Sequence, residues 1–192
     1  MPTATLSKPL AEPGLRNEPI SPLVLARHTA GPVHEYEELG VGHLLHIARA
    51  LAPRASHWPG RWRPRRRDWE LLATSSNYEA WVIAWPPGGC IEFHDHGHSA
   101  GAVLVVEGQL RETAVLEDSA GDSHFTTKAV RAGEAITFGA SYVHCLVNVE
   151  RAPAVSVHVY SPRLTSMTHF DVVDGRLQPS HTDQYGGALS VV

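Results

Sequence analysis

The sequence predicts an all-β protein, an antiparallel barrel or sandwich, with a small helical segment ahead of it. With 192 residues, 43% of them hydrophobic, the chain is long enough for one domain with a sizeable core but short for two. After Tyr78 it breaks into short strand-like runs separated by glycine and proline at close intervals. Little helical periodicity lies between these runs, which favours antiparallel β-structure over an alternating α/β sheet.

The segment before the strand-like runs has three parts. Residues 1–22 contain five prolines and few large apolar side chains, so we expect a disordered tail, followed by a single domain over residues 23–192. Apolar residues recur at roughly helical spacing over about 33–51, and Pro53 is expected to end that helix. Residues 54–69 form a basic, tryptophan-bearing connector, which is expected either to be a solvated loop or to supply an anion-binding arginine.

The strand-like runs place the barrel at about residues 69–175. Each run is rich in β-branched, aromatic or other apolar residues and stops at a turn former. The runs are 78–85, 90–96, 101–108, 110–117, 124–130, 135–139, 143–150 and 154–162. The last section, from about Arg163 to Val192, has scattered apolar residues and turn formers, and we expect it either to add an edge strand or to wrap the barrel.

Composition and charge narrow the classes of function. The net charge of −4 gives no overall attraction to a phosphate backbone or an anionic lipid surface, so neither nucleic acid nor a membrane is expected as a partner. No apolar run approaches the roughly 20 residues of a membrane helix, and residues 1–14 lack the apolar core of a secretion signal. Cys90 and Cys145 are too few for a disulfide scaffold and are expected to pack as small apolar side chains. We expect a cytoplasmic protein that is a monomer or a weak homo-oligomer.

The chain has 13 histidines, and two of them form a pair with strand spacing. His94 and His96 flank Asp95, and a strand's period of two would put both imidazoles on the same, inward face. His144, in another predicted strand, is the natural third nitrogen donor. Three imidazoles suit a divalent transition metal, iron or zinc, although such pairs also occur on solvated strands. His98 is a weaker alternative ligand, and the remaining histidines show no matching partner.

A second polar row lies in the predicted strand 154–162. Ser156, His158 and Tyr160 are spaced by two, so their side chains share one face of the strand. Such a row can form a hydrogen-bonded chain in which Ser156 orients His158 and His158 holds the Tyr160 hydroxyl. The alternative is the polar outer face of a half-buried strand, and the row alone does not decide between the two.

These motifs resemble known signatures between about residues 78 and 162. Glycines around the histidine pair and a downstream Gly, His and Asn fall at the offsets of the two-part cupin signature. These residues are Gly88, Gly108, Gly133, His144 and Asn148. Gly101 stands where many cupins have a glutamate ligand, and Gly139 and Ser141 stand where Pro and Gly are usual. With the His-Asp-His pair, the HxxxN spacing and the Ser-x-His-x-Tyr-Ser-Pro row, the chain resembles the cysteine dioxygenase family of the cupins.

The resemblance implies a cupin-type antiparallel β-barrel, or jelly roll, with Fe(2+) as its cofactor. The implied metal ligands are His94, His96 and His144, and the implied catalytic residues are Ser156, His158 and Tyr160. Members of the family oxidise a small thiol to its sulfinic acid with dioxygen, so a thiol substrate and O2 are the implied partners. L-Cysteine is the leading substrate, ahead of 3-mercaptopropionate and cysteamine-like thiols.

Two details of the resemblance concern the substrate and the tyrosine. Many members bind the substrate carboxylate with an arginine just before the first barrel strand, and Arg67 is the best match, with Arg65 and Arg66 behind it. Substrate binding is therefore expected of Arg67 and Tyr160. In animal members a cysteine is joined to the tyrosine by a thioether, and here Gly101 stands at that place. We expect no such crosslink, as in bacterial members.

Two other classes of function stay open at this point. A cupin with the same ligands can catalyse a different reaction, such as a carbon–carbon cleaving dioxygenation. A metal-binding sensor or small-molecule binding module is the third class, and in that case the Ser-His-Tyr row would be merely structural.

Overall fold

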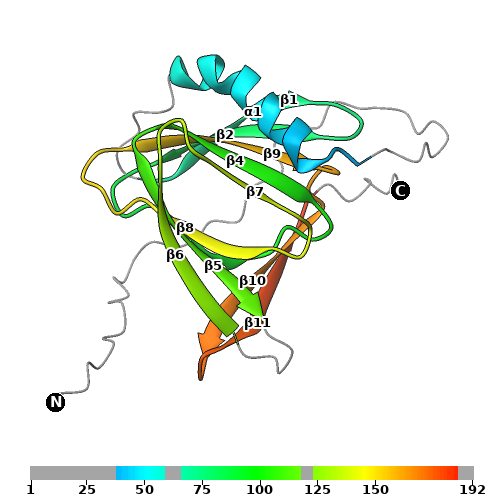
Figure 1. Cartoon of the computed structure of the whole chain (residues 1–192), viewed down its shortest axis with the longest axis vertical. Coiled ribbons are helices and arrows are strands. Elements are labelled where there is room, and N and C mark those ends of the chain that lie inside the picture. Colours follow the sequence, from blue (N-terminus) through cyan, green and yellow to red (C-terminus); the bar gives the residue numbers. More distant parts are fainter. Residues whose placement is uncertain (1–37, 59–65, 118–122, 186–192) are drawn as a thin grey trace, which may run out of the picture.

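A computed structural model describes residues 38–58, 66–117 and 123–185 (Figure 1). Within these ranges the chain forms one helix and eleven strands. The elements are α1 (Val41–Ser56), β1 (Asp68–Thr74), β2 (Glu79–Trp85), β3 (Cys90–His94), β4 (Ala100–Glu107), β5 (Gln109–Glu117), β6 (Ser123–Arg131), β7 (Ala135–Phe138), β8 (Val143–Val147), β9 (Ala154–Ser161), β10 (Ser166–Val173) and β11 (Arg176–Gln184). The predicted tail, residues 1–22, lies outside the described residues. No helix in the described ranges is long and apolar enough to cross a membrane.

The strands form two antiparallel sheets, which together make up the barrel (Figure 1). One sheet has the order β1-β2-β9-β4-β7, and the other has the order β11-β10-β3-β8-β5-β6. The pairings are nested, because β2 pairs with β9, β3 with β8, β4 with β7 and β5 with β6. A chain that folds back on itself in this way and wraps into two facing sheets is a jelly roll. The prediction of an all-β, cupin-type barrel with a small helix is confirmed.

The predicted strands are all present, as β2 to β9. β1 is absent from the predicted runs because Asp68 and Trp69 fall in the basic connector. In the structure Glu70 and Leu71 are both exposed, so this strand also lacks the alternation of a half-buried strand. The section after Arg163 forms the hairpin of β10 and β11, which pairs with β3 and lengthens the second sheet. The barrel region therefore continues to Gln184 rather than ending near residue 175.

The helix differs from its prediction. It spans Val41–Ser56 rather than 33–51, and Pro53 lies inside it instead of ending it. Pro53 has no N–H to donate to the carbonyl four residues earlier, so one helical hydrogen bond is missing in the last turn. Ala55 and Trp58 are nevertheless buried in the hydrophobic cluster between the helix and the sheet. Tertiary packing therefore holds the final turn in place beyond the proline.

Strand β9 is buried along its full length because its sheet is covered on both faces. The side chains that pack in the cluster beneath α1 are Val155, Val157 and Val159. Burying each of these valines contributes about 1.5–3 kcal/mol to the hydrophobic stabilisation. The alternate positions of β9 point into the barrel, where Tyr160 packs in the second cluster with Trp85 and Phe138. Ser156 and His158 share the inward face, so their row is not a solvated outer surface.

Candidate metal centre

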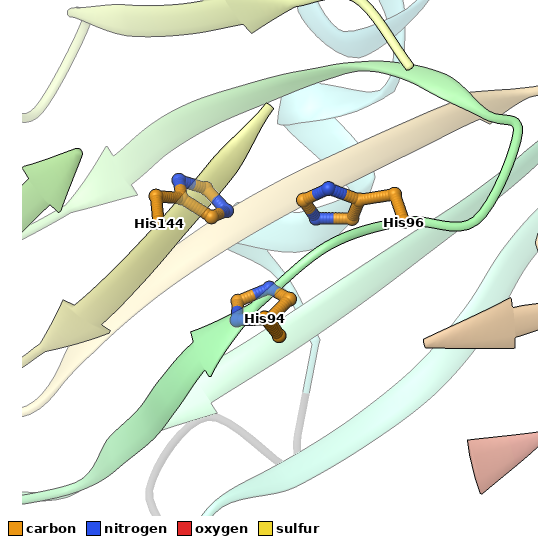
Figure 2. A group of neighbouring side chains, drawn as sticks. All are labelled: His94, His96 and His144. Carbon is orange, nitrogen blue, oxygen red and sulfur yellow. The ribbon is translucent and has the colours of Figure 1, made fainter. Parts of the chain in front are cut away.

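The structure brings His94, His96 and His144 together inside the barrel. Figure 2 shows the three imidazole rings turned toward a common space. His94 is the last residue of β3 and lies directly opposite His144 of β8, with ring centroids 4.8 Å apart. The His96 ring lies 4.8 Å from that of His94 and 5.1 Å from that of His144. One nitrogen of each ring lies within 4.8 Å of the others, and all three side chains are buried, so the cluster could hold a metal ion.

A turn, rather than strand alternation, places His96. The sequence analysis put His94 and His96 on one strand, but β3 ends at His94. Asp95 follows, and its Oδ1 accepts hydrogen bonds from the backbone N–H of Gly97 at 3.0 Å and of Thr168 at 2.8 Å. This side-chain-to-backbone turn carries His96 back toward the barrel interior and ties it to β10.

Hydrogen bonds fix which nitrogen of two rings is free to bind. His94 Nδ1 lies 2.7 Å from the Glu92 carbonyl oxygen, which can only accept, so Nδ1 carries the hydrogen and Nε2 keeps its lone pair. His144 Nδ1 lies 2.8 Å from Glu112 Oε1 and donates in the same way. Neither nitrogen of His96 has a hydrogen-bond partner among the described residues, although the backbone of Tyr142 approaches the ring. A buried ring without partners is costly unless something binds it, which fits a metal site.

The protonation state also suits metal binding. Burial, followed by repulsion from the neighbouring imidazoles, holds the pKa values of His94 and His96 well below their usual range. Both rings are therefore neutral near pH 7, and a neutral imidazole is the form that binds metal ions. The donor set is three imidazole nitrogens, which accepts Fe(2+) as well as other divalent transition metals.

Glu112 is a buried carboxylate behind His144. Its side chain is 1% exposed, and besides His144 it accepts a hydrogen bond from the Tyr142 hydroxyl at 3.0 Å. Lys128 Nζ lies 3.1 Å from the other carboxylate oxygen, and the lysine side chain is largely exposed. Burial acts to raise the pKa of Glu112, but the hydrogen bond and charge of His144, together with Lys128, more than offset it, so the net pKa is lowered. A carboxylate that holds a ligating imidazole in this way fixes its tautomer and raises its basicity.

Gly101 and Phe138 explain the missing glutamate. Gly101 lies opposite Phe138 in the pairing of β4 with β7, and a Cβ on Gly101 would collide with Phe138 Cζ. The Phe138 ring stacks on His96 with centroids 4.4 Å apart. An aromatic ring thus occupies the space that a longer side chain at position 101 would need. Gly101 also pairs with Tyr160 across β4 and β9 and has no side chain to offer it.

The Ser-His-Tyr row lies beside the histidine cluster. Ser156 Oγ is 2.8 Å from His158 Nε2, and His158 Nδ1 is 3.1 Å from the Tyr160 hydroxyl. Trp85 Nε1 donates to Ser156 Oγ at 2.8 Å. The Tyr160 ring stacks on His96 with centroids 5.4 Å apart, which joins the row to the cluster.

The donors and acceptors of the row give it a direction. Burial, with smaller contributions from the charges of His144 and Arg67, lowers the pKa of His158 to about 3, so the ring is neutral at pH 7. A neutral ring has one N–H and one lone pair, so His158 donates in one of these two hydrogen bonds and accepts in the other. In the tautomer with the hydrogen on Nδ1, Ser156 donates to Nε2, Nδ1–H donates to the Tyr160 oxygen, and the Tyr160 hydroxyl hydrogen is free to donate toward a bound molecule. Burial raises the pKa of Tyr160, so the hydroxyl keeps its hydrogen.

Arg67 lies close to the row. Its guanidinium carbon lies 5.5 Å from the centroid of Trp85 and 5.7 Å from that of Trp69. Its Nη1 donates to the Cys90 carbonyl at 3.2 Å, and the side chain interacts electrostatically with Tyr160 and with Tyr185 of the C-terminal region. Burial lowers the pKa of Arg67, but a guanidinium remains charged at neutral pH. Arg66 is exposed, and Arg65 lies outside the described residues.

Several residues near the site were missed or misplaced by sequence reasoning. Glu112 was not singled out, because a lone acid in a strand-like run gives no motif. His169 has no matching partner in the sequence, yet it is buried on β10 with its ring centroid 6.1 Å from that of His94. Cys90 is exposed rather than packed inside, and Cys145 is half-buried. His98 is exposed and lies outside the histidine cluster.

Comparison with solved structures gives matches of low sequence identity. TT1209 from Thermus thermophilus is 22% identical, with 54% of this chain and 90% of that chain covered and a TM-score of 0.43. Oxalate oxidase in complex with the substrate analogue glycolate is 18% identical, with coverages of 53% and 54% and a TM-score of 0.46. The Schizosaccharomyces pombe Cnp3 cupin domain is 11% identical, with coverages of 50% and 61% and a TM-score of 0.43. The chain spans about half the length of the oxalate oxidase that it matches.

Comparison with protein-family models gives a longer match. The model of the family described as cysteine dioxygenase type I matches residues 36–173. That range is most of the chain and contains both the three-histidine cluster and the Ser-His-Tyr row. By this match the chain belongs to the cysteine dioxygenase type I family.

Proposed function

We propose that the protein is an Fe(2+)-dependent thiol dioxygenase that oxidises a small thiol, L-cysteine in the first place, to its sulfinic acid. The reaction balances as one thiol and one dioxygen giving one sulfinic acid. Family membership supports the reaction class. The observation that carries the proposal is a buried cluster of three imidazoles packed directly against a hydrogen-bonded Ser-His-Tyr row.

In this proposal His94, His96 and His144 hold the iron. A bound Fe(2+) would supply coordination positions for a thiolate and for dioxygen and a route for electrons from sulfur to oxygen. The protein's part is to present three lone pairs at once. The Glu92 carbonyl and Glu112 do this for His94 and His144 by holding their Nδ1 hydrogens. His96 is held by stacking on Phe138 and Tyr160.

The row controls one hydrogen near the reacting atoms. His158 cannot take a proton near pH 7, so it does not act as a general base. In the tautomer with the hydrogen on Nδ1, the ring lies 3.1 Å from the Tyr160 oxygen, donates to it and directs the hydroxyl hydrogen away from itself. Tyr160 then donates a hydrogen bond to a bound oxygen or to the substrate without losing its own proton.

Arg67 supports a substrate with a carboxylate. Its guanidinium lies over Trp85, and the Trp85 ring in turn stacks against His158 with centroids 6.1 Å apart. A fixed guanidinium fork binds a carboxylate with two parallel hydrogen bonds. We therefore place cysteine and 3-mercaptopropionate, which carry a carboxylate, ahead of cysteamine, which does not.

The first test is oxygen uptake by protein loaded anaerobically with Fe(2+) and given cysteine, 3-mercaptopropionate or cysteamine in turn. We expect uptake with a carboxylate-bearing thiol and a product that gains two oxygen atoms by mass spectrometry. His144→Ala, which loses a nitrogen donor, is expected to bind little iron and consume no oxygen. If iron-loaded protein consumes no oxygen with any of the three thiols, the proposed reaction is rejected, while the assignment of the fold is unaffected.

A second test separates catalysis from simple metal binding. Tyr160→Phe removes one hydroxyl and keeps the ring that stacks on His96. We expect it to lower turnover by about 10²–10³-fold, as loss of a single preorganised donor does, while Fe(2+) affinity stays within a few-fold. In a sensor or binding module, the same substitution would not change ligand affinity, and there would be no turnover to lose. That outcome would reject the catalytic role of the row.

A further inference from the structure

A second group of metal-ligating side chains lies on the neighbouring hairpin. In the six-stranded sheet β3, β10 and β11 are adjacent, and His94, His169 and His181 are paired residues in one row across them. Asp183 lies two residues beyond His181, on the same face of β11. One ring nitrogen of His169, one of His181 and a carboxylate oxygen of Asp183 lie within 4.8 Å of one another.

His169 is the buried member of this group, and its hydrogen bonding is incomplete. The residue is 6% exposed, and neither ring nitrogen has a partner among the described residues that meets strict hydrogen-bond geometry. Its Nε2 lies 3.3 Å from Asp183 Oδ2, and this contact with Asp183 is a weak one that acts to raise the pKa of His169 against the larger effect of burial. A buried imidazole in this state carries a desolvation cost that a bound cation would remove.

His181 and Asp183 each have a metal-ligating atom close to the His169 ring. The His181 ring lies parallel to that of His169, with centroids 4.4 Å apart. His181 Nδ1 lies 3.2 Å from Ser180 Oγ, so its Nε2 is the nitrogen left for a ligand. Asp183 Oδ2 accepts a hydrogen bond from the Tyr185 hydroxyl at 3.2 Å, which orients the carboxylate from outside the group.

We propose that His169, His181 and Asp183 form a second metal site, and that its ligand is a divalent transition-metal ion with zinc as the best match. Two imidazoles and one carboxylate are a common zinc donor set, with a fourth position left for water. The site differs from the first centre in its donor atoms, because Asp183 offers a carboxylate oxygen and the first centre offers three imidazole nitrogens. The proposal is independent of the dioxygenase reaction.

A structural ion pair is the competing explanation for the same residues. An ion pair between His169 and Asp183 would need a protonated imidazole with good hydrogen-bond geometry, and the two atoms do not have that geometry. It also gives no role to His181, whose ring is stacked parallel to that of His169. A shared cation accounts for all three side chains at once.

The test is the number of zinc ions bound by the metal-free full chain, without a histidine tag, in competition with a chromophoric chelator. We expect two zinc ions for the wild type. His181→Gln and Asp183→Asn are each expected to weaken the second ion by at least about tenfold, since even changes outside the ligand set commonly cost 10–100-fold. Both residues lie on an edge strand and are at least partly exposed, so thermal unfolding should show an intact fold.

Two matched variants locate the ions. His46→Gln changes an exposed histidine of α1 outside both groups and should still bind two zinc ions. His144→Ala removes a ligand of the first centre and should retain one zinc ion, which His181→Gln in the same chain then weakens. One zinc ion for the wild type, or unchanged zinc affinity in both His181→Gln and Asp183→Asn, overturns the second site.

Discussion

Replacing Glu112 by glutamine tests how the protein prepares His144 for metal binding. Glutamine keeps an oxygen that can accept from His144 Nδ1 and from the Tyr142 hydroxyl, so the shape of the network is preserved. What is lost is the negative charge 2.8 Å from the imidazole. The substitution therefore isolates the electrostatic part of the interaction from its geometry.

The size of the effect follows from the environment of Glu112. A buried hydrogen bond to a charged group contributes about 1.5–3 kcal/mol, and glutamine retains part of it. Outer partners of metal ligands typically change metal affinity by 10–100-fold, or about 1.4–2.7 kcal/mol. We expect Glu112→Gln to weaken Fe(2+) binding within that range. Lys128→Met is the matched control, and we expect a smaller change than in Glu112→Gln because the lysine side chain is 58% exposed and water screens its charge.

The assay is anaerobic competition for Fe(2+), and separately for Co(2+), between metal-free protein and a chelator. Circular dichroism and thermal unfolding of each variant show whether the barrel is intact. If Glu112→Gln binds both metals as tightly as the wild type while His144→Ala binds them poorly, the carboxylate does not tune His144. An equal loss in Lys128→Met and Glu112→Gln would also contradict the reasoning, because it would assign the effect to the surface charge.

Three further predictions follow from the same geometry. Gly101→Ala should lower the free energy of unfolding by about 1–3 kcal/mol in urea titrations, because the added Cβ meets the Phe138 ring. Phe138→Leu in the same chain should restore part of the loss. An unchanged urea midpoint for Gly101→Ala would contradict this reasoning. Arg67→Gln should raise KM for cysteine at least about tenfold and leave KM for cysteamine unchanged, and equal effects on both thiols would remove Arg67 from carboxylate binding. The pKa of His158 is about 3 in the folded chain and about 6.5 in the unfolded chain, so the unfolded chain binds more protons between these pH values. The free energy of unfolding therefore falls as the pH drops through this window, by up to about 1.4 kcal/mol per pH unit. Urea titrations of metal-free wild type and His158→Gln from pH 7 to 5 should show a shallower dependence in the variant, and equal slopes would refute the buried neutral ring.

The barrel was predictable because its signals are local. Alternating apolar residues and turn formers mark β2 to β9 one at a time, and the strand spacing of Ser156, His158 and Tyr160 correctly predicts a shared face. The failures have tertiary causes. Pro53 reads as a helix end in the sequence, but burial of Ala55 and Trp58 keeps the last turn helical.

The site was predictable where a sequence motif marks its residues and not where residues meet only through strand pairing. His94, His96 and His144 are visible from their spacing and family offsets. Glu112 approaches His144 only because β5 pairs with β8, and no local pattern in β5 distinguishes it. His169 and His181 are twelve positions apart in the sequence and meet only through the register of the β10–β11 hairpin.

The most direct test of the central claim is turnover of cysteine by the Fe(2+)-loaded protein under ¹⁸O2, followed by mass spectrometry of the product. The account predicts cysteine sulfinic acid with both oxygen atoms labelled, formed by the wild type and not by His144→Ala. Cystine as the main product, or sulfinic acid that carries unlabelled oxygen from water, would contradict a dioxygenase at this centre.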